Sequence, residues 1–136
     1  MGILENKSNE NHAAGLILIN QNHFSSSVHC SYYSCIQLMK HILLSNGGKT
    51  EEELYVMQKS TNQNLHEFLI NHFIRQLRQN NVYHTYRNSI GKLAELKVLR
   101  NDSDYKEITI DETKAILASD LSSKILKDLK YLNGIR

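Results

Sequence analysis

The chain has no proline, no tryptophan and only six glycines among its 136 residues. Proline and glycine interrupt helices, so their scarcity permits long, continuous helices. An all-β domain would need many turn residues between its strands, and few are present here. No segment alternates apolar and polar residues for long, so no strand is predicted. The composition therefore predicts an all-α protein.

Cysteine is also scarce, since only Cys30 and Cys35 are present. Their spacing within a helical stretch fits neither a zinc pair nor a disulfide framework, and two free thiols are typical of a reducing cytosol. The N-terminal residues 1–10 are polar and lack the apolar centre of a signal peptide. The apolar run Leu16–Ile19 is far too short to span a bilayer. We expect a soluble, cytoplasmic protein without a membrane segment.

The net charge of the chain does not favour any class of ligand, because 16 Lys and Arg residues are nearly balanced by 14 Asp and Glu residues. Such a balance neither requires nor excludes a nucleic-acid partner. The sequence contains no glycine-rich phosphate loop and no His-Glu-x-x-His pattern. We therefore expect neither a cofactor nor a metal ion.

Apolar residues at helical spacing predict five main helices and one short helix in a single domain of residues 10–136. The polar residues 1–9 are expected to be a flexible N-terminus. The first helix is predicted over residues 10–22, with an apolar stripe that includes Ile17 and Leu18. Short loops indicate antiparallel neighbours, so we expect an up-and-down helical bundle.

Capping patterns in the sequence predict where most of the remaining helices begin. Serines 25–27 are predicted to cap the second helix. Thr50, Asn64 and Thr109 each precede a glutamate by three residues, a pattern that predicts the N-terminal caps of three further helices. The fifth helix is expected over residues 83–99 or beyond. The predicted core stripe of the second helix comprises Val28, Tyr32, Cys35, Ile36, Met39, Ile42 and Leu43.

Two motifs carry a resemblance to a known family. The stretch Asn22–Tyr33 has a small polar turn and an aromatic residue before a helix with a pair of tyrosines. The stretch Leu99–Tyr105 has an arginine and a polar residue late in a helix, followed by an Asp-Tyr pair. Together with His66 and Phe73 in the intervening helix, these motifs resemble the HEPN superfamily over about residues 10–132.

The resemblance implies an up-and-down bundle that forms a homodimer. The superfamily includes toxin ribonucleases, partners of small nucleotidyltransferases and many stand-alone proteins. It therefore implies RNA, a nucleotide or a nucleotidyltransferase-type protein as the partner, within a toxin–antitoxin or stress-response system. Family membership does not by itself choose among these functions.

The catalytic pattern of the active HEPN ribonucleases is incomplete in this sequence. That pattern consists of an arginine, a polar residue and, a few positions later, a histidine. Arg100 and Asn101 match the first two elements, whereas Tyr105 stands where the histidine is expected and no histidine follows His84. The phenol of a tyrosine keeps its proton at neutral pH, so it is a poor base. We therefore expect a non-catalytic module that binds nucleotide, RNA or a partner protein.

Two alternatives stay open at this stage. One is a metal-independent endoribonuclease toxin with a variant active site built on Arg100, Asn101 and Tyr105. The other is a purely structural dimer, in which Arg100 pairs with Asp104 one turn further along the helix. The candidate ligand-binding residues combine cations for phosphate with polar and aromatic side chains for a base. They are Arg100, Asn101, Asp104, Tyr105, Lys97, Tyr33 and His29.

Overall fold

The computed structural model describes residues 2–134, and within that range it contains six helices and no strand. The all-α prediction is thus confirmed for the described residues, none of whose helices is long and apolar enough to cross a membrane. The helices are α1 (Ile3–Asn20), α2 (Phe24–Asn46), α3 (Glu51–Lys59), α4 (Leu65–Gln79), α5 (Tyr83–Tyr105) and α6 (Glu112–Leu132).

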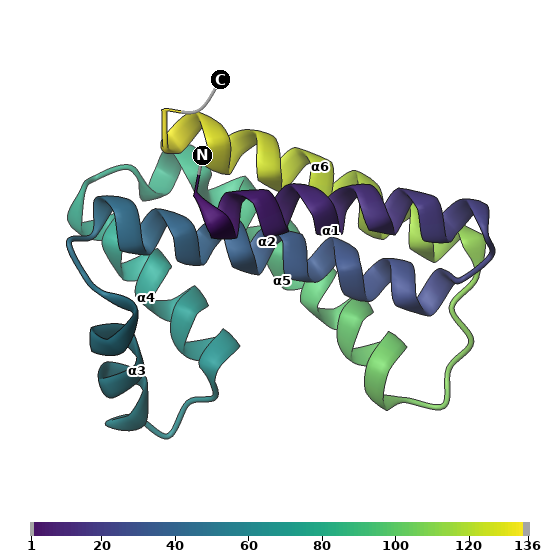
Figure 1. Cartoon of the computed structure of the whole chain (residues 1–136), viewed down its shortest axis with the longest axis horizontal. Coiled ribbons are helices and arrows are strands. Elements are labelled where there is room, and N and C mark those ends of the chain that lie inside the picture. The colour runs from purple at the N-terminus through teal and green to yellow at the C-terminus, as the bar shows by residue number, and fades with distance from the viewer. Residues whose placement is uncertain (1, 135–136) are drawn as a thin grey trace.

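The long helices run alternately up and down, and α3 and α4 extend from one end of this bundle (Figure 1). Helix α2 is central, because it packs against α1, α4, α5 and α6. Every residue of its predicted apolar stripe is buried, so this prediction is confirmed. The stripe was recognisable because large apolar side chains recur at helical spacing on one face.

Helix α1 begins at Ile3, so the predicted start at residue 10 was wrong. Residues 3–9, which we expected to be flexible, are the first turns of α1, while Met1 lies outside the described residues. The predicted apolar stripe was also wrong, since Ile17 is 56% exposed. The buried residues of α1 are instead the small Ser8 and Gly15.

Small residues bring α1 and α2 close together. The hydroxyl of Ser8 donates to the carbonyl oxygen of Ser34 at 2.6 Å, and Ser27 Oγ donates to that of Gly15 at 2.8 Å. A Cβ atom at Gly15 would lie 3.3 Å from Ser31 Oγ, closer than most packed side chains allow. Buried hydroxyls with partners do not lose the hydrogen bonds that water would supply, so a polar face is stable here.

The predicted helix caps are confirmed at Thr50 and Asn64, whose side chains accept from the backbone N–H groups three residues later. Two other predictions were wrong. Serines 25–27 lie inside the first turns of α2, which follows His23 without a side-chain cap. The cap of α6 is Asp111 rather than Thr109, and its carboxylate accepts from the N–H of Lys114 at 2.9 Å.

The C-terminal end of α5 is held against the start of α2, because Ser103 Oγ donates to the carbonyl oxygen of Ser25 at 2.9 Å. Helix α5 continues through Tyr105, so the polar residues of its last turns stand at helical spacing. This places Lys97, Arg100 and Asn101 across from the first turn of α4.

Candidate functional site

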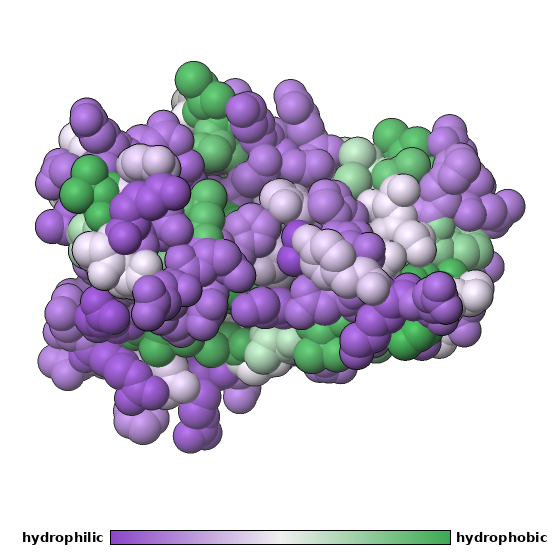
Figure 2. Space-filling view, turned by 90° about the horizontal axis from the view of Figure 1, so that it is seen from below, coloured by the Kyte–Doolittle hydropathy of each residue, from purple (hydrophilic) through white to green (hydrophobic). Residues whose placement is uncertain are grey.

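A cleft of about 500 Å³ lies between the N-terminal end of α4 and the C-terminal half of α5. Its volume is within the range of small-molecule sites. Figure 2 shows that the face seen from below, where α3, α4 and the end of α5 lie, is mostly hydrophilic. A polar ligand therefore suits this part of the surface. The cleft is lined by Asn64, Leu65, His66, Lys97, Arg100, Asn101 and Tyr105.

Arg100 is the central side chain of the cleft. Its Nε lies 2.9 Å from Asp104 Oδ2, an ion pair between successive turns of α5. The guanidinium carbon lies 5.3 Å from the ring centroid of Tyr32 and 5.2 Å from that of Tyr105. Only 12% of the Arg100 side chain is exposed. The ion pair and the rings thus fix the direction of the guanidinium group.

The two terminal nitrogens of Arg100 have only long hydrogen bonds. Nη1 donates to Asn101 Oδ1 at 3.4 Å, and Nη2 donates to the Tyr105 hydroxyl at 3.3 Å. Hydrogen bonds from a guanidinium to an anion are usually shorter than 3 Å. A phosphate oxygen in the cleft could therefore replace these weak contacts with stronger, charge-assisted ones.

His29 of α2 joins the cluster through the same carboxylate. Its Nδ1 lies 2.9 Å from Asp104 Oδ2, and its ring stacks on Tyr33 with the centroids 4.4 Å apart. Because a carboxylate only accepts hydrogen bonds, Nδ1 carries the proton in this contact. Asp104 therefore orients both Arg100 and His29, and its negative charge is shared between them.

His66 is a member of the site that sequence reasoning did not place there. It lies in the first turn of α4, with its ring centroid 5.1 Å from that of Tyr33 and 5.6 Å from that of Tyr32. Burial lowers the pKa of His66, and the charges of Arg100 and Lys97 lower it further. These effects favour the neutral imidazole, in which one ring nitrogen can accept a proton.

All the residues predicted from sequence gather at this site. Arg100, Asn101, Tyr105 and Lys97 line the cleft. Asp104 and Tyr33 contact Arg100, and His29 contacts both of these residues. The one sequence signal for His66 was the predicted resemblance of its position to that of a histidine in the HEPN superfamily. Within residues 2–134, no three His, Cys, Asp or Glu side chains come together as a metal site would require.

The arrangement suits the binding of an anion. Two basic side chains, Arg100 and Lys97, line the cleft, and the adjacent carboxylate of Asp104 is engaged by Arg100 and His29. No protein-family model, curated protein or solved structure matches this chain. The resemblance to the HEPN superfamily therefore stays a prediction.

Proposed function

We propose that this chain is a HEPN-type module that binds a phosphate-bearing ligand, a nucleotide or RNA, in the cleft around Arg100 without transforming it. The observation that carries the proposal is the guanidinium of Arg100, fixed by Asp104 through Nε and left with only long hydrogen bonds at its two terminal nitrogens. Those nitrogens form the fork that matches two phosphate oxygens.

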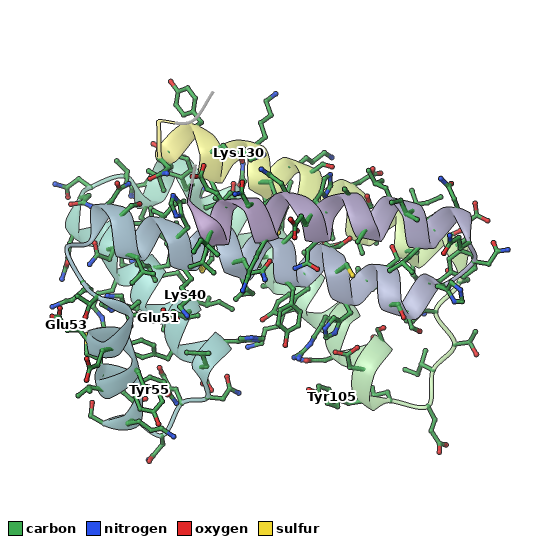
Figure 3. All side chains as sticks on the ribbon, in the orientation of Figure 1. Lys40, Glu51, Glu53, Tyr55, Tyr105 and Lys130 are labelled. Atoms are coloured by element: carbon green, nitrogen blue, oxygen red, sulfur yellow. The ribbon has the colours of Figure 1, made fainter. Side chains whose placement is uncertain are left out.

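Other residues supply the remaining features of a nucleotide site. Lys97 adds a second cation in the cleft, and Asn64 and Asn101 offer amide groups that can both donate and accept. Tyr105 is 73% exposed at the end of α5, where its label stands in Figure 3. An exposed tyrosine ring can stack on a nucleobase.

The resemblance extends the proposal to partners. It implies that two copies of the chain form a homodimer, and that a nucleotidyltransferase-type protein is a further partner. A toxin–antitoxin or stress-response system is the setting that the resemblance implies. A two-fold dimer would present the same surface of both copies to each other.

The proposal predicts that Arg100→Gln weakens ligand binding. Isothermal titration of the wild-type protein with adenosine diphosphate should show saturable binding, which the variant weakens about 10- to 100-fold, the effect of one or two charge-assisted hydrogen bonds. Arg87→Gln is the matched control, because Arg87 is an exposed arginine of α5 outside the cleft. Equal binding by both variants, or no binding by the wild type, would contradict the proposal.

A second candidate function is metal-independent RNA cleavage, and the position of His66 favours it. A neutral imidazole beside an arginine can take the proton of a ribose 2′-hydroxyl, whose oxygen then bonds to phosphorus as the P–O5′ bond breaks. The imidazolium can return that proton to the leaving 5′-oxygen, while the arginine stabilises the phosphate charge. Incubation of RNA with the protein in the presence of a chelator separates the two functions. Cleavage that disappears in both Arg100→Gln and His66→Phe would support this enzyme, whereas intact RNA is the outcome that we expect.

A further inference from the structure

A second concave surface lies between α1 and α6, and it shares no residue with the cleft around Arg100. Its volume is about 600 Å³. Figure 3 shows the two places on opposite sides of the bundle, with Lys130 on α6 and Tyr105 at the far end of α5. We call this surface the α1–α6 groove, and it is lined by His12, Ser123, Leu126, Lys127, Asp128, Lys130 and Tyr131.

Most of the groove is one face of α6. Ser123, Lys127, Lys130 and Tyr131 recur at intervals of three or four residues or next to one another, so they project from the same side of the helix. Leu126 is buried at the base of this face. The methylene stems of the lysines add further apolar surface around it. The groove therefore combines an apolar floor with charged groups at its rim.

Two lysines and one carboxylate line the groove among the described residues, so positive charge predominates there. Neither Lys127 nor Lys130 forms a salt bridge within residues 2–134. The ammonium group of Lys130 donates to Asn9 Oδ1 at 3.1 Å, which holds it beside α1. Asp128 is the one carboxylate that lines the groove among the described residues, and it accepts a 2.5 Å hydrogen bond from Ser89 Oγ of α5.

The surroundings of His12 also contain positive charge and hydroxyl groups. Its two ring nitrogens lie 3.5 Å from Ser122 Oγ and 3.4 Å from Ser123 Oγ, so hydroxyls rather than carboxylates surround it. Burial lowers the pKa of His12, and the charge of Lys130 lowers it further. Ser122 is fully buried and also contacts Ser34 Oγ at 2.9 Å. The His12 ring thus forms one wall of the groove, and its surroundings favour the neutral imidazole.

We propose that the α1–α6 groove binds a small organic anion with a flat apolar body. The acidic head, a sulfonate, phosphate or carboxylate, lies between the ammonium groups of Lys127 and Lys130. The body lies on Leu126 and against the ring of Tyr131. The volume of the groove is in the range that encloses a ligand of this size.

The test uses 8-anilinonaphthalene-1-sulfonate, which joins an acidic head to an aromatic body and becomes fluorescent in apolar surroundings. The wild-type protein should bind it saturably at one site. The double variant Lys127→Gln/Lys130→Gln should bind it about tenfold more weakly or worse, as expected for the loss of one or more charge-assisted contacts. Lys114→Gln/Lys124→Gln is the matched control, since it removes the same charge from exposed or half-exposed positions of α6 outside the groove.

Two further measurements test the parts of the proposal separately. Tyr131→Ser should weaken binding of the dye, because it removes the ring against which the apolar body lies. The uncharged analogue N-phenyl-1-naphthylamine should bind equally well to the wild type and to the Lys127→Gln/Lys130→Gln variant. Arg100→Gln should leave binding unchanged, because Arg100 lies in the other cleft. The proposal is overturned if binding is not saturable, if both double variants bind like the wild type, or if Arg100→Gln abolishes binding.

Discussion

Replacing Tyr32 with alanine is expected to lower the free energy of unfolding by about 3–5 kcal/mol, the usual effect of deleting a large buried ring. Tyr32 is 0% exposed in the central helix α2. Its ring centroid lies 5.9 Å from that of Tyr33 and 5.6 Å from that of His66, so it joins the core to the candidate site. The alanine variant would leave a cavity between α2, α4 and α5 that these neighbours cannot fill without moving.

The matched control is Tyr32→Phe, which keeps the ring and removes only the hydroxyl. That hydroxyl is buried and has no hydrogen-bond partner within residues 2–134, and burial raises the pKa of Tyr32 to about 12. Removing an unpaired buried hydroxyl should change the free energy of unfolding by no more than about 1 kcal/mol, in either direction. Urea unfolding followed by circular dichroism measures both variants. A phenylalanine variant as unstable as the alanine variant would contradict this account.

Helix α2 could be predicted from sequence because its core residues are large and apolar. Val28, Tyr32 and Met39 are among the side chains that produce a clear helical periodicity, and each is buried as predicted. The same reasoning failed for α1, which buries Ser8 and Gly15. Hydropathy gives no signal for such a face, because its stability comes from close backbone approach and from hydroxyls that donate to carbonyl groups.

The prediction of helix N-termini from sequence is limited in a related way. A side chain that can cap and a glutamate three residues later identified Thr50 and Asn64. The same pattern at Thr109 predicted the wrong cap, because Asp111, two residues further on, also accepts well at an N-terminus. Local sequence offers both residues, and the path of the chain between α5 and α6 decides which one is used.

Some contacts of the candidate site could be predicted from sequence and others could not. Arg100, Asp104 and Tyr105 belong to successive turns of one helix, so spacing alone predicted that they are neighbours. His66 enters from α4, and its approach depends on how α4 packs on α2 and α5. No spacing rule predicts a contact of that kind between distant segments. The absence of a histidine from the sequence motif therefore does not exclude one from the site, since His66 of another helix lines the same cleft as Arg100.

Asp104→Asn is expected to act in opposite directions on stability and on ligand binding. The Asp104 carboxylate is 20% exposed and pairs with both Arg100 and His29. Its loss leaves Arg100, with a side chain only 12% exposed, without its ionic partner. We expect the free energy of unfolding to fall by about 1–2 kcal/mol, less than for a fully buried pair because solvent screens part of the interaction.

Binding of an anion should nevertheless become stronger in the same variant. Asp104 is a negative charge beside a site that we propose to hold phosphate, and like charges repel. Its removal should tighten the binding of adenosine diphosphate about tenfold at low ionic strength, with a smaller gain in high salt because salt screens the repulsion. The asparagine has nearly the same shape, so the cleft keeps its volume.

Asp102→Asn separates this local effect from a general change of charge. Asp102 also lies near the end of α5, but its Oδ1 pairs with Lys106 Nζ at 3.0 Å and it does not line the cleft. The Asp102 variant should therefore bind the nucleotide within about twofold of the wild type. If Asp104→Asn instead weakens both stability and binding, the ion pair is needed to position Arg100, and repulsion by Asp104 is the smaller of the two effects. Stronger binding by a less stable protein would show that the charge of Asp104 repels an anion bound in the cleft.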